Sequence, residues 1–447
     1  MEKDLLQNRI RCVTDGAREV RSCYKRVRIR DYLFGQAVYN LGDYPAQVFS
    51  DITDYDRQLI RNLADAGVQM IQLHEDWNDV CRLYGGDKYS SSDPQGTRNF
   101  VEYCHSCGIK VIAYVSTGYF HEPDPEFREE YAPRKEFLAS LYYKYRKCDL
   151  GHPGWRKYIT EKTLSAMDSY GLDGIYNDWG YSRYQPELGD CCLPEGYYDP
   201  QLEDALGEIY SKIKSRGGIY KLHCDRNNAP PCKDRVYDYL WIGEYVGADT
   251  IGAGKEHLPY VVPCIDLQFE KELTYDMYYA YTIPFLQFPL MKTGRPMLGN
   301  NLEIPGFTYY GGFEQDLYTR IRDYNRTHPD GPFAHSHWSS IPDDPDEYVA
   351  WEKYAKLYKP MVTENSIAYI QLQDYDRILS PVGGKIVASL FVNEQTYLVV
   401  SNLSNMPYQL RLQGQWRDRE RGTVAENFTI QPKRILFLEA EQAVKEA

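Results

Sequence analysis

Short apolar runs alternate with amphipathic stretches along the chain from about residue 36 to residue 300. Apolar residues in the amphipathic stretches recur every three or four positions, as they do on one face of a helix. Four of these stretches end at a glycine, which is typical of a helix C-terminus that leads into the next strand: Gly67, Gly108, Gly171 and Gly217. The apolar runs predict strands within 36–41, 68–77, 109–120, 172–180, 218–225, 237–245, 258–266 and 283–291.

Repeated strand–helix units of this kind predict a parallel sheet with helices packed outside it. Eight units within one region of this length fit a (β/α)₈ TIM barrel better than an open doubly wound sheet. No G-x-G-x-x-G motif follows a predicted strand, which argues against a dinucleotide site. We therefore predict an α/β fold built on a (β/α)₈ barrel, and no cofactor.

The pattern differs at the two ends of the chain. Residues 1–35 contain a helical pattern, DLLQNRIRCVTDGAREV. After Pro360, short runs alternate apolar and polar residues and are separated by turn residues, which favours a small antiparallel β-sandwich. We predict three parts: an N-terminal helical segment at 1–35, a (β/α)₈ barrel at 36–362 and a C-terminal β-sandwich at 363–447.

Composition narrows the classes of partner. The net charge of −13 argues against binding to nucleic acid or to an anionic membrane. No run approaches the ~18 apolar residues of a membrane helix. The 42 tyrosines combine apolar rings with polar tips, which suits the faces and hydroxyls of sugars, although an aromatic-rich core explains them equally well.

Eleven cysteines, an odd number without a repeated spacing, favour reduced thiols over a disulfide framework. The pair Cys104 and Cys107 lies inside a predicted helix, so we expect buried thiols there and not a redox motif. The N-terminal residues MEKDLLQNRIRC have no apolar stretch of the signal-peptide kind. We expect a cytoplasmic protein, and the sequence leaves open a leader that has been removed.

Charged and aromatic residues gather where the predicted strands end. In a barrel, the C-terminal ends of the strands form the functional face, and carboxylates within a strand core would cost free energy. We therefore predict a mouth that binds a polar ligand, with tryptophan rings stacking under a sugar or, alternatively, packing against neighbouring elements. The candidate binding residues are His74, Glu75, Asp76, Trp77, Trp179, His223, Asp225, Arg226, Trp241 and Asp266.

The fourth predicted strand carries two aspartates, Asp173 and Asp178, in GLDGIYNDWGY. They are five residues apart, so in a regular strand their side chains point to opposite faces. Asp173 lies at the start of the strand, where we expect a structural bond to a neighbouring loop. Asp178 lies at the functional end, and we predict that it is catalytic; a capping role at the turn is the alternative.

Cleavage of a glycosidic bond needs a second carboxyl group across the mouth. We favour Glu244 as the acid/base, because it follows an apolar strand and neighbouring aromatic rings would raise its pKa by desolvation. An ion pair with a nearby Lys or Arg is the alternative role for Glu244, and Asp225, Asp249 and Asp266 are alternative partners. The spacing of His335 and His337, two residues apart, is a weak signal for a metal site, so we expect no metal site.

These residues resemble glycoside hydrolases that join a (β/α)₈ barrel to a C-terminal β-sandwich: the α-galactosidase-like, α-glucosidase-like and α-amylase-like groups. In those groups an Asp at the end of the fourth strand is the nucleophile, often after G-x-D-G-x-x-x-D, and GLDGIYND ending at Asp178 has this spacing. The α-amylase-like pattern has an Arg two residues before the nucleophile, where this chain has Tyr176. The resemblance is therefore greatest to the first two groups, whose acid/base on the sixth strand, usually Asp, matches Glu244.

The sequence thus predicts a glycosidase, retaining and exo-acting, with Asp178 as nucleophile, Glu244 as acid/base and a carbohydrate substrate. A catalytically silent barrel that binds glycans is one alternative, and a metal-dependent barrel hydrolase or lyase is another. Sugar, linkage, anomer and oligomeric state depend on features that the sequence pattern does not encode.

Overall fold

The computed structural model describes residues 2–41, 52–74, 77, 89–91, 93–122, 124–133, 145–178, 198–224, 230–242, 260–264, 274–295, 327 and 345–441. The chain divides into two compact units. We call Gly35–Trp241 with Leu290–Pro345 the parallel unit, and Met1–Phe34 with Ile242–Pro289 and Asp346–Ala447 the antiparallel unit.

An eight-stranded sheet has the order β10-β9-β8-β7-β4-β3-β2-β11. The six strands from β8 to β11 in this order pair in parallel. The strands of the parallel unit are β2 (Gln36–Asn40), β3 (Met70–Leu73), β4 (Lys110–Val115), β7 (Gly174–Asn177), β8 (Ile219–Cys224), β9 (Tyr239–Ile242) and β11 (Met291–Gly294), while β10 (Val261–Pro263) belongs to the antiparallel unit.

The order of this sheet follows the order of the chain and then returns to its start. Strand β11, the last along the chain, pairs with β2, the first, in the register Met291↔Ala37. The sheet is also curled, because Lys221 of β8 donates a hydrogen bond of 3.0 Å to Gln36 of β2 although three strands separate them. The predicted parallel α/β architecture is thereby confirmed.

The last predicted strand, at 283–291, was wrong in its position. Residues Ile283–Phe285 form a 3₁₀ turn, η5, and Leu286 adopts a left-handed conformation with φ 57°. Pro284 favours this turn because its fixed φ suits the first turn of a helix. Strand β11 begins only at Met291.

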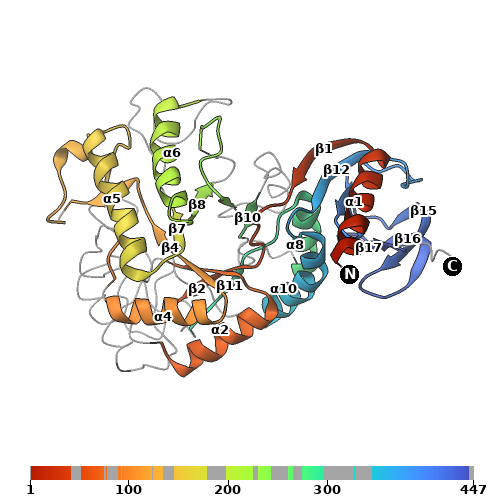
Figure 1. Cartoon of the computed structure of the whole chain (residues 1–447), viewed down its shortest axis with the longest axis horizontal. Helices are drawn as coiled ribbons and strands as arrows, with labels where there is room; N and C mark the ends of the chain where they lie inside the picture. Colours follow the sequence, from red (N-terminus) through yellow and green to blue (C-terminus); the bar gives the residue numbers. More distant parts are fainter. Residues whose placement is uncertain are drawn as a thin grey trace. The chain divides into compact units, whose positions relative to one another are not determined.

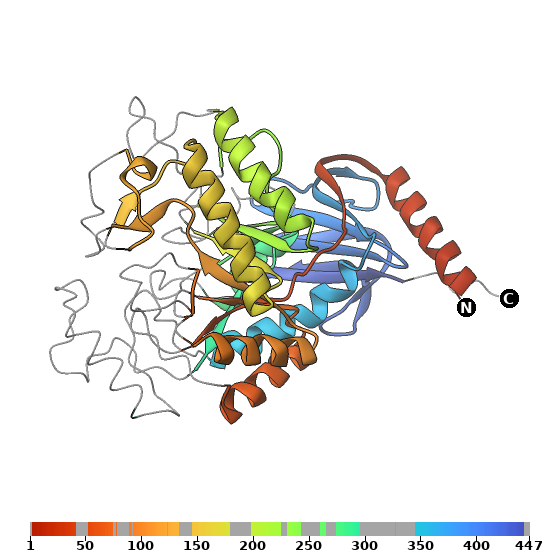
Figure 2. The ribbon, with the colours of Figure 1, turned by 60° about the vertical axis from the view of Figure 1, so that its left-hand side comes forward.

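Helices α2 (Asp54–Ala66), α4 (Pro94–Ser106), α5 (Pro153–Tyr170) and α6 (Pro200–Lys214) connect the strands of the parallel unit (Figure 1). Side chains of Thr53, Asp93, His152 and Asp199 accept hydrogen bonds from the first turns of these helices. The four glycines predicted to end the helices all have positive φ, from 70° to 106°. Figure 2 shows α5 and α6 lying side by side along the outside of the sheet.

Between β4 and α5 the chain forms a short antiparallel pair, β5 (Tyr119–His121) with β6 (Tyr145–Lys147), and the 3₁₀ turn η2 (Glu129–Tyr131). Arg146 of β6 is buried and forms ion pairs with Glu122 and Glu129 at 3.3 and 3.2 Å. Trp155 of α5 donates to the carbonyl oxygen of Thr117. This bond holds the segment between β4 and α5 against the helix.

The antiparallel unit contains a seven-stranded sheet with the order β1-β12-β13-β14-β17-β15-β16. The sequence predicted its C-terminal strands except the one at 424–430, and the sheet encloses a core that includes Leu390, Leu398 and Trp416. The strands are β1 (Val20–Arg28), β12 (Ile367–Tyr375), β13 (Ile386–Val392), β14 (Thr396–Asn402), β15 (Tyr408–Asp418), β16 (Val424–Ile430) and β17 (Arg434–Ala440). Its helices are α1 (Glu2–Glu19), α8 (Tyr275–Thr282), α10 (Pro345–Tyr358) and the 3₁₀ turn η7 (Lys359–Met361).

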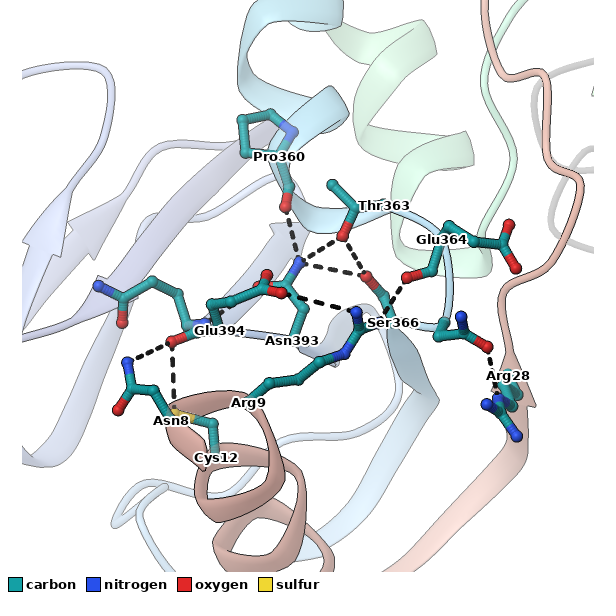
Figure 3. A network of polar contacts seen from close by, with 12 residues as sticks. Asn8, Arg9, Cys12, Arg28, Pro360, Thr363, Glu364, Ser366, Asn393 and Glu394 are labelled. Atoms are coloured by element: carbon teal, nitrogen blue, oxygen red, sulfur yellow. Dashed lines mark hydrogen bonds and ion pairs between the residues drawn. The ribbon is translucent and has the colours of Figure 1, made fainter. Parts of the chain in front are cut away.

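The sequence predicted helix α1 but missed strand β1, which pairs antiparallel with β12. The segment VRSCYKRVR exposes most of its side chains, so its apolar alternation is weak. Figure 3 shows how α1 is held: Asn8 Nδ2 and Cys12 Sγ donate to the carbonyl oxygen of Glu394 at 3.3 and 3.5 Å. Arg9 lies 3.6 Å from the Glu394 carboxylate.

Seven cysteines are free thiols: Cys12, Cys23, Cys104, Cys107, Cys148, Cys232 and Cys264. Cys104 of α4 is buried, and burial raises its thiol pKa well above 9.0, as it does for Cys148. Such thiols are poor nucleophiles at neutral pH. Among the described helices, none combines the length and apolar character needed to cross a membrane.

Candidate active site

Side chains on the inner face of the curled sheet form a polar and aromatic lining. Tyr114, Tyr176 and Lys221 are register partners on β4, β7 and β8, so their side chains point to the same face. The contact between Lys221 and Gln36 identifies this face as the inner one. Residues of the other parity face the helices: Tyr220 stacks on Tyr210 of α6.

Asp178 follows β7 at its C-terminal end and lies on the inner face. Its side chain is buried, with 9% of the residue exposed. Both carboxylate oxygens have a partner from a neighbouring strand: the Tyr114 hydroxyl donates to Oδ2 at 2.8 Å, and His223 Nδ1 lies 2.7 Å from Oδ1. These contacts fix the carboxylate in rotation as well as in position.

The His223 ring lies between two aromatic side chains. The hydroxyl oxygen of Tyr176 is 3.0 Å from His223 Nδ1, and the two rings are nearly parallel. The Trp241 ring meets the imidazole edge to face, with centroids 4.3 Å apart. The Lys221 ammonium lies 5.7 Å from the centroid of Tyr176 on the side toward Gln36. These contacts on the inner face of the sheet therefore hold the His223 ring in place.

The outer-facing Asn177 ties three strands together beneath the site. Its amide nitrogen donates to the hydroxyls of Thr117 and Tyr220 at 3.0 and 2.7 Å, and its oxygen accepts from the Thr117 backbone N–H. Because Asn177 immediately precedes Asp178, these bonds define where the strand end lies.

Asp173 immediately precedes β7, at the end opposite to Asp178, as its place in the sequence predicts. Its carboxylate accepts from the Val111 backbone N–H at 2.8 Å and lies 2.7 Å from His105 Nε2 of α4. This is the structural bond to a neighbouring segment that the sequence led us to expect.

Two further candidates are placed by the structure. His74 follows β3, and its ring contacts Tyr114 edge to face with centroids 5.6 Å apart, so it belongs to the same lining. Trp77 is fully buried; its indole N–H donates to the Tyr114 carbonyl oxygen and its ring packs on Tyr170 of α5. That placement leaves no ring face for a sugar, so Trp77 is a packing residue.

The other candidates lie outside the described residues: Glu75, Asp76, Trp179, Asp225, Arg226, Glu244 and Asp266, with the alternatives Asp249, His335 and His337. The described part of the chain holds no group of three metal-ligating side chains. Within that same part, the side-chain atoms of Asn40, the Ser116 hydroxyl and the Trp241 indole nitrogen are buried and have no hydrogen-bond partner. Buried polar atoms usually have partners, so a polar ligand would complete them.

The sequence was compared with known proteins. No protein-family model matches it, and no curated protein matches it. Solved structures do match by fold. The α-glucosyl transfer enzyme XgtA superposes with a TM-score of 0.57 at 12% identity, over 92% of this chain and 99% of its own.

Two α-amylases give similar values. The enzyme from Geobacillus thermoleovorans, solved with acarbose, has a TM-score of 0.55 at 10% identity over 92% of this chain and 100% of its own. The noncanonic maltogenic AmyB from Thermotoga neapolitana has 0.54 at 12% identity over 91% and 99%. This chain shares the fold of these enzymes. The resemblance inferred from its motifs is confirmed at that level.

The sequence prediction missed Tyr114, which donates to Asp178, and Lys221, which lies beside Tyr176. Tyr114 and Lys221 lie inside apolar runs, VIAYV and IYKLHC, where only their polarity distinguishes them. A signal was present: each lies on the inward parity of its strand, as Asp178 does on β7. The Lys221 ammonium is the clearest of these signals, because a charged side chain is rarely buried in a strand without a role.

Proposed function

We propose that the protein is a retaining, exo-acting glycoside hydrolase with Asp178 as its nucleophile. The supporting observation is a buried carboxylate at a strand C-terminus with a hydrogen-bond partner on each oxygen. Functional groups of (β/α)₈ barrels gather at this end of the strands. The return of β11 to β2 supports a closed barrel at 36–362, and the antiparallel strands support a β-sandwich at 363–447.

In this mechanism a carboxylate oxygen of Asp178 attacks the anomeric carbon while the leaving oxygen takes a proton from the second carboxyl group. Water then cleaves the glycosyl ester, and the second carboxylate takes its proton. We propose Glu244 for this second role, with Asp225, Asp249 and Asp266 as alternatives. A separation of about 5 Å between the two carboxyl groups would support retention.

Substrate hydroxyls are proposed to meet the lining beside Asp178. Asn40, Ser116 and Trp241 are among the described residues with buried polar side-chain atoms that have no partner, and hydroxyl groups of a sugar pair with such donors and acceptors. Trp241 also offers an aromatic surface next to His223. His74 contributes from the end of β3.

The decisive experiment is a screen of aryl α- and β-glycosides against the wild type, Asp178→Asn and Asp173→Asn. We expect wild-type turnover of at least one glycoside, none with Asp178→Asn, and retained turnover with Asp173→Asn, which changes a carboxylate at the other end of the same strand. All three should have the same far-UV circular dichroism.

Full activity in Asp178→Asn would sink the proposal. Binding of glycans without hydrolysis, unchanged in Asp178→Asn, would instead support a catalytically silent barrel. Inactivation by a chelator would support a metal-dependent enzyme.

A further inference from the structure

His223 contacts the carboxylate of Asp178, so a second residue acts on the proposed nucleophile. We propose that His223 is a positioning residue, which holds the Asp178 carboxylate correctly oriented through its Nδ1–H. This inference rests on the proposed function of Asp178. The sequence had suggested substrate binding for His223, but its Nδ1 is 2.7 Å from the carboxylate.

The hydrogen positions follow from the acceptors around Nδ1. An ionised carboxylate only accepts hydrogen bonds, so Nδ1 carries the proton and donates it to Asp178 Oδ1. The Tyr176 hydroxyl oxygen, at 3.0 Å from the same nitrogen, is then a second acceptor of that proton. The Tyr114 hydroxyl donates to the other oxygen, Oδ2. Charge-assisted bonds of this kind are stronger than neutral ones.

The ring of His223 is itself fixed by its surroundings. Only 3% of His223 is exposed, and the Tyr176 and Trp241 rings restrain it on two sides. Lys221, two residues earlier on β8, lies near the Tyr176 ring and is held by Gln36 across the sheet. The Nδ1–H group of His223 therefore points toward Asp178.

The α-amylase-like pattern places an Arg where this chain has Tyr176, two residues before the nucleophile. In this chain the neighbouring strand β8 supplies the donor to Asp178, and Tyr176 orients that donor. The His223 imidazole from β8 and the Tyr114 phenol from β4 thus hold the Asp178 carboxylate from two different strands.

The test uses a 2-deoxy-2-fluoroglycosyl fluoride of the sugar that the aryl glycoside screen identifies. An Asp178 oxygen attacks the anomeric carbon, the C–F bond breaks and fluoride leaves, so the protein gains the mass of one fluoroglycosyl group. The trapping rate is measured by mass spectrometry for the wild type, His223→Leu and His223→Asn. Steady-state kcat and KM are measured alongside.

We expect His223→Leu to lower both the trapping rate and kcat by about 10²-fold, the loss typical of a misplaced reacting group, with KM changed less than threefold. His223→Asn should restore at least a tenth of the wild-type rate, because its amide nitrogen occupies the place of Nδ1. The matched control is His105→Leu, which removes a histidine 2.7 Å from Asp173 at the other end of β7 and should leave kcat unchanged.

The possible failures are distinguishable. If the wild type is not labelled and hydrolyses no glycoside, the proposed function is wrong. If the wild type is labelled at Asp178 but His223→Leu is labelled at the same rate, His223 is not a positioning residue and the proposed function stands. Equal losses in His223→Leu and His223→Asn would also overturn the inference, because the donor would then be irrelevant.

Discussion

At the scale of single residues, Asp178 is defined by its neighbours more than by its own motif. The carboxylate is held by groups from β4 and β8, which lie on either side of β7 in the sheet. Position along the strand separates its role from that of Asp173, which precedes β7 and whose bonds are structural. A short acidic motif therefore contains one residue for each end of the strand.

The Tyr114 hydroxyl offers the simplest residue-scale prediction. Tyr114→Phe removes the donor to Asp178 Oδ2 but keeps the ring contacts with Tyr176 and His74. Since a hydrogen bond to a charged group contributes about 1.5–3 kcal/mol, we expect kcat to fall roughly ten- to a hundredfold. The control is Tyr103→Phe, whose hydroxyl donates to the Arg57 carbonyl on the outer helices. Equal activities in the two variants would contradict this role for Tyr114.

At the scale of elements, a buried ion pair joins α2 to the residue that follows β11. Arg295 donates to Asp56 at 2.8 Å, and Tyr39 of β2 donates to the same carboxylate. Gly294 is required beside it, because a Cβ there would lie 2.3 Å from the Asn40 carbonyl oxygen. The pair therefore secures the junction at which the last strand meets the first.

Asp56→Asn should destabilise this junction by about 3 kcal/mol, because it leaves the Arg295 charge buried without its counterion. Burial acts to raise the pKa of Asp56, but the charge and hydrogen bonds of Arg295 hold it below its ordinary value of 3.8. The contribution of Asp56 to stability is thus complete above the unfolded pKa and is lost as pH falls through the lower folded pKa.

Urea unfolding at several pH values measures this difference. The gap between wild type and Asp56→Asn should be constant from about pH 8 to pH 5 and should narrow below the ordinary value of 3.8. A gap that widens on acidification would show that the pKa is raised, and would refute the ion-pair account.

Most elements could be predicted from the sequence, because amphipathic periodicity and glycine stops are local signals. Strand β1 and the place of β11 could not. The pairing of β1 depends on β12, more than three hundred residues away, and β11 follows a proline-rich turn whose apolar residues imitate a strand. Among the residues around Asp178, only those at the ends of strands were predicted from the sequence. Gln36 and Lys221 contact each other because the sheet curls, and no local sequence pattern encodes that curvature.

At the scale of the whole molecule, each unit has its own core. Leu398 of β14 is fully buried in the core of the antiparallel unit. Leu398→Ala should cost about 2–5 kcal/mol through lost burial and the cavity that remains. Hydrogen exchange should accelerate in β13, β14 and β17 more than in β3 and β4. Uniform acceleration across both sheets would show that the chain opens as one cooperative body.

The pairing of β1 with β12 has a consequence for the order in which the molecule is made. Residues 20–28 are synthesised more than three hundred residues before their partner strand at 367–375. Until β12 has been synthesised, the edge of β1 that pairs with it stays unpaired. Unpaired strand edges favour association with other chains. Strand β1 can therefore pair with β12 only after more than three hundred further residues have been synthesised.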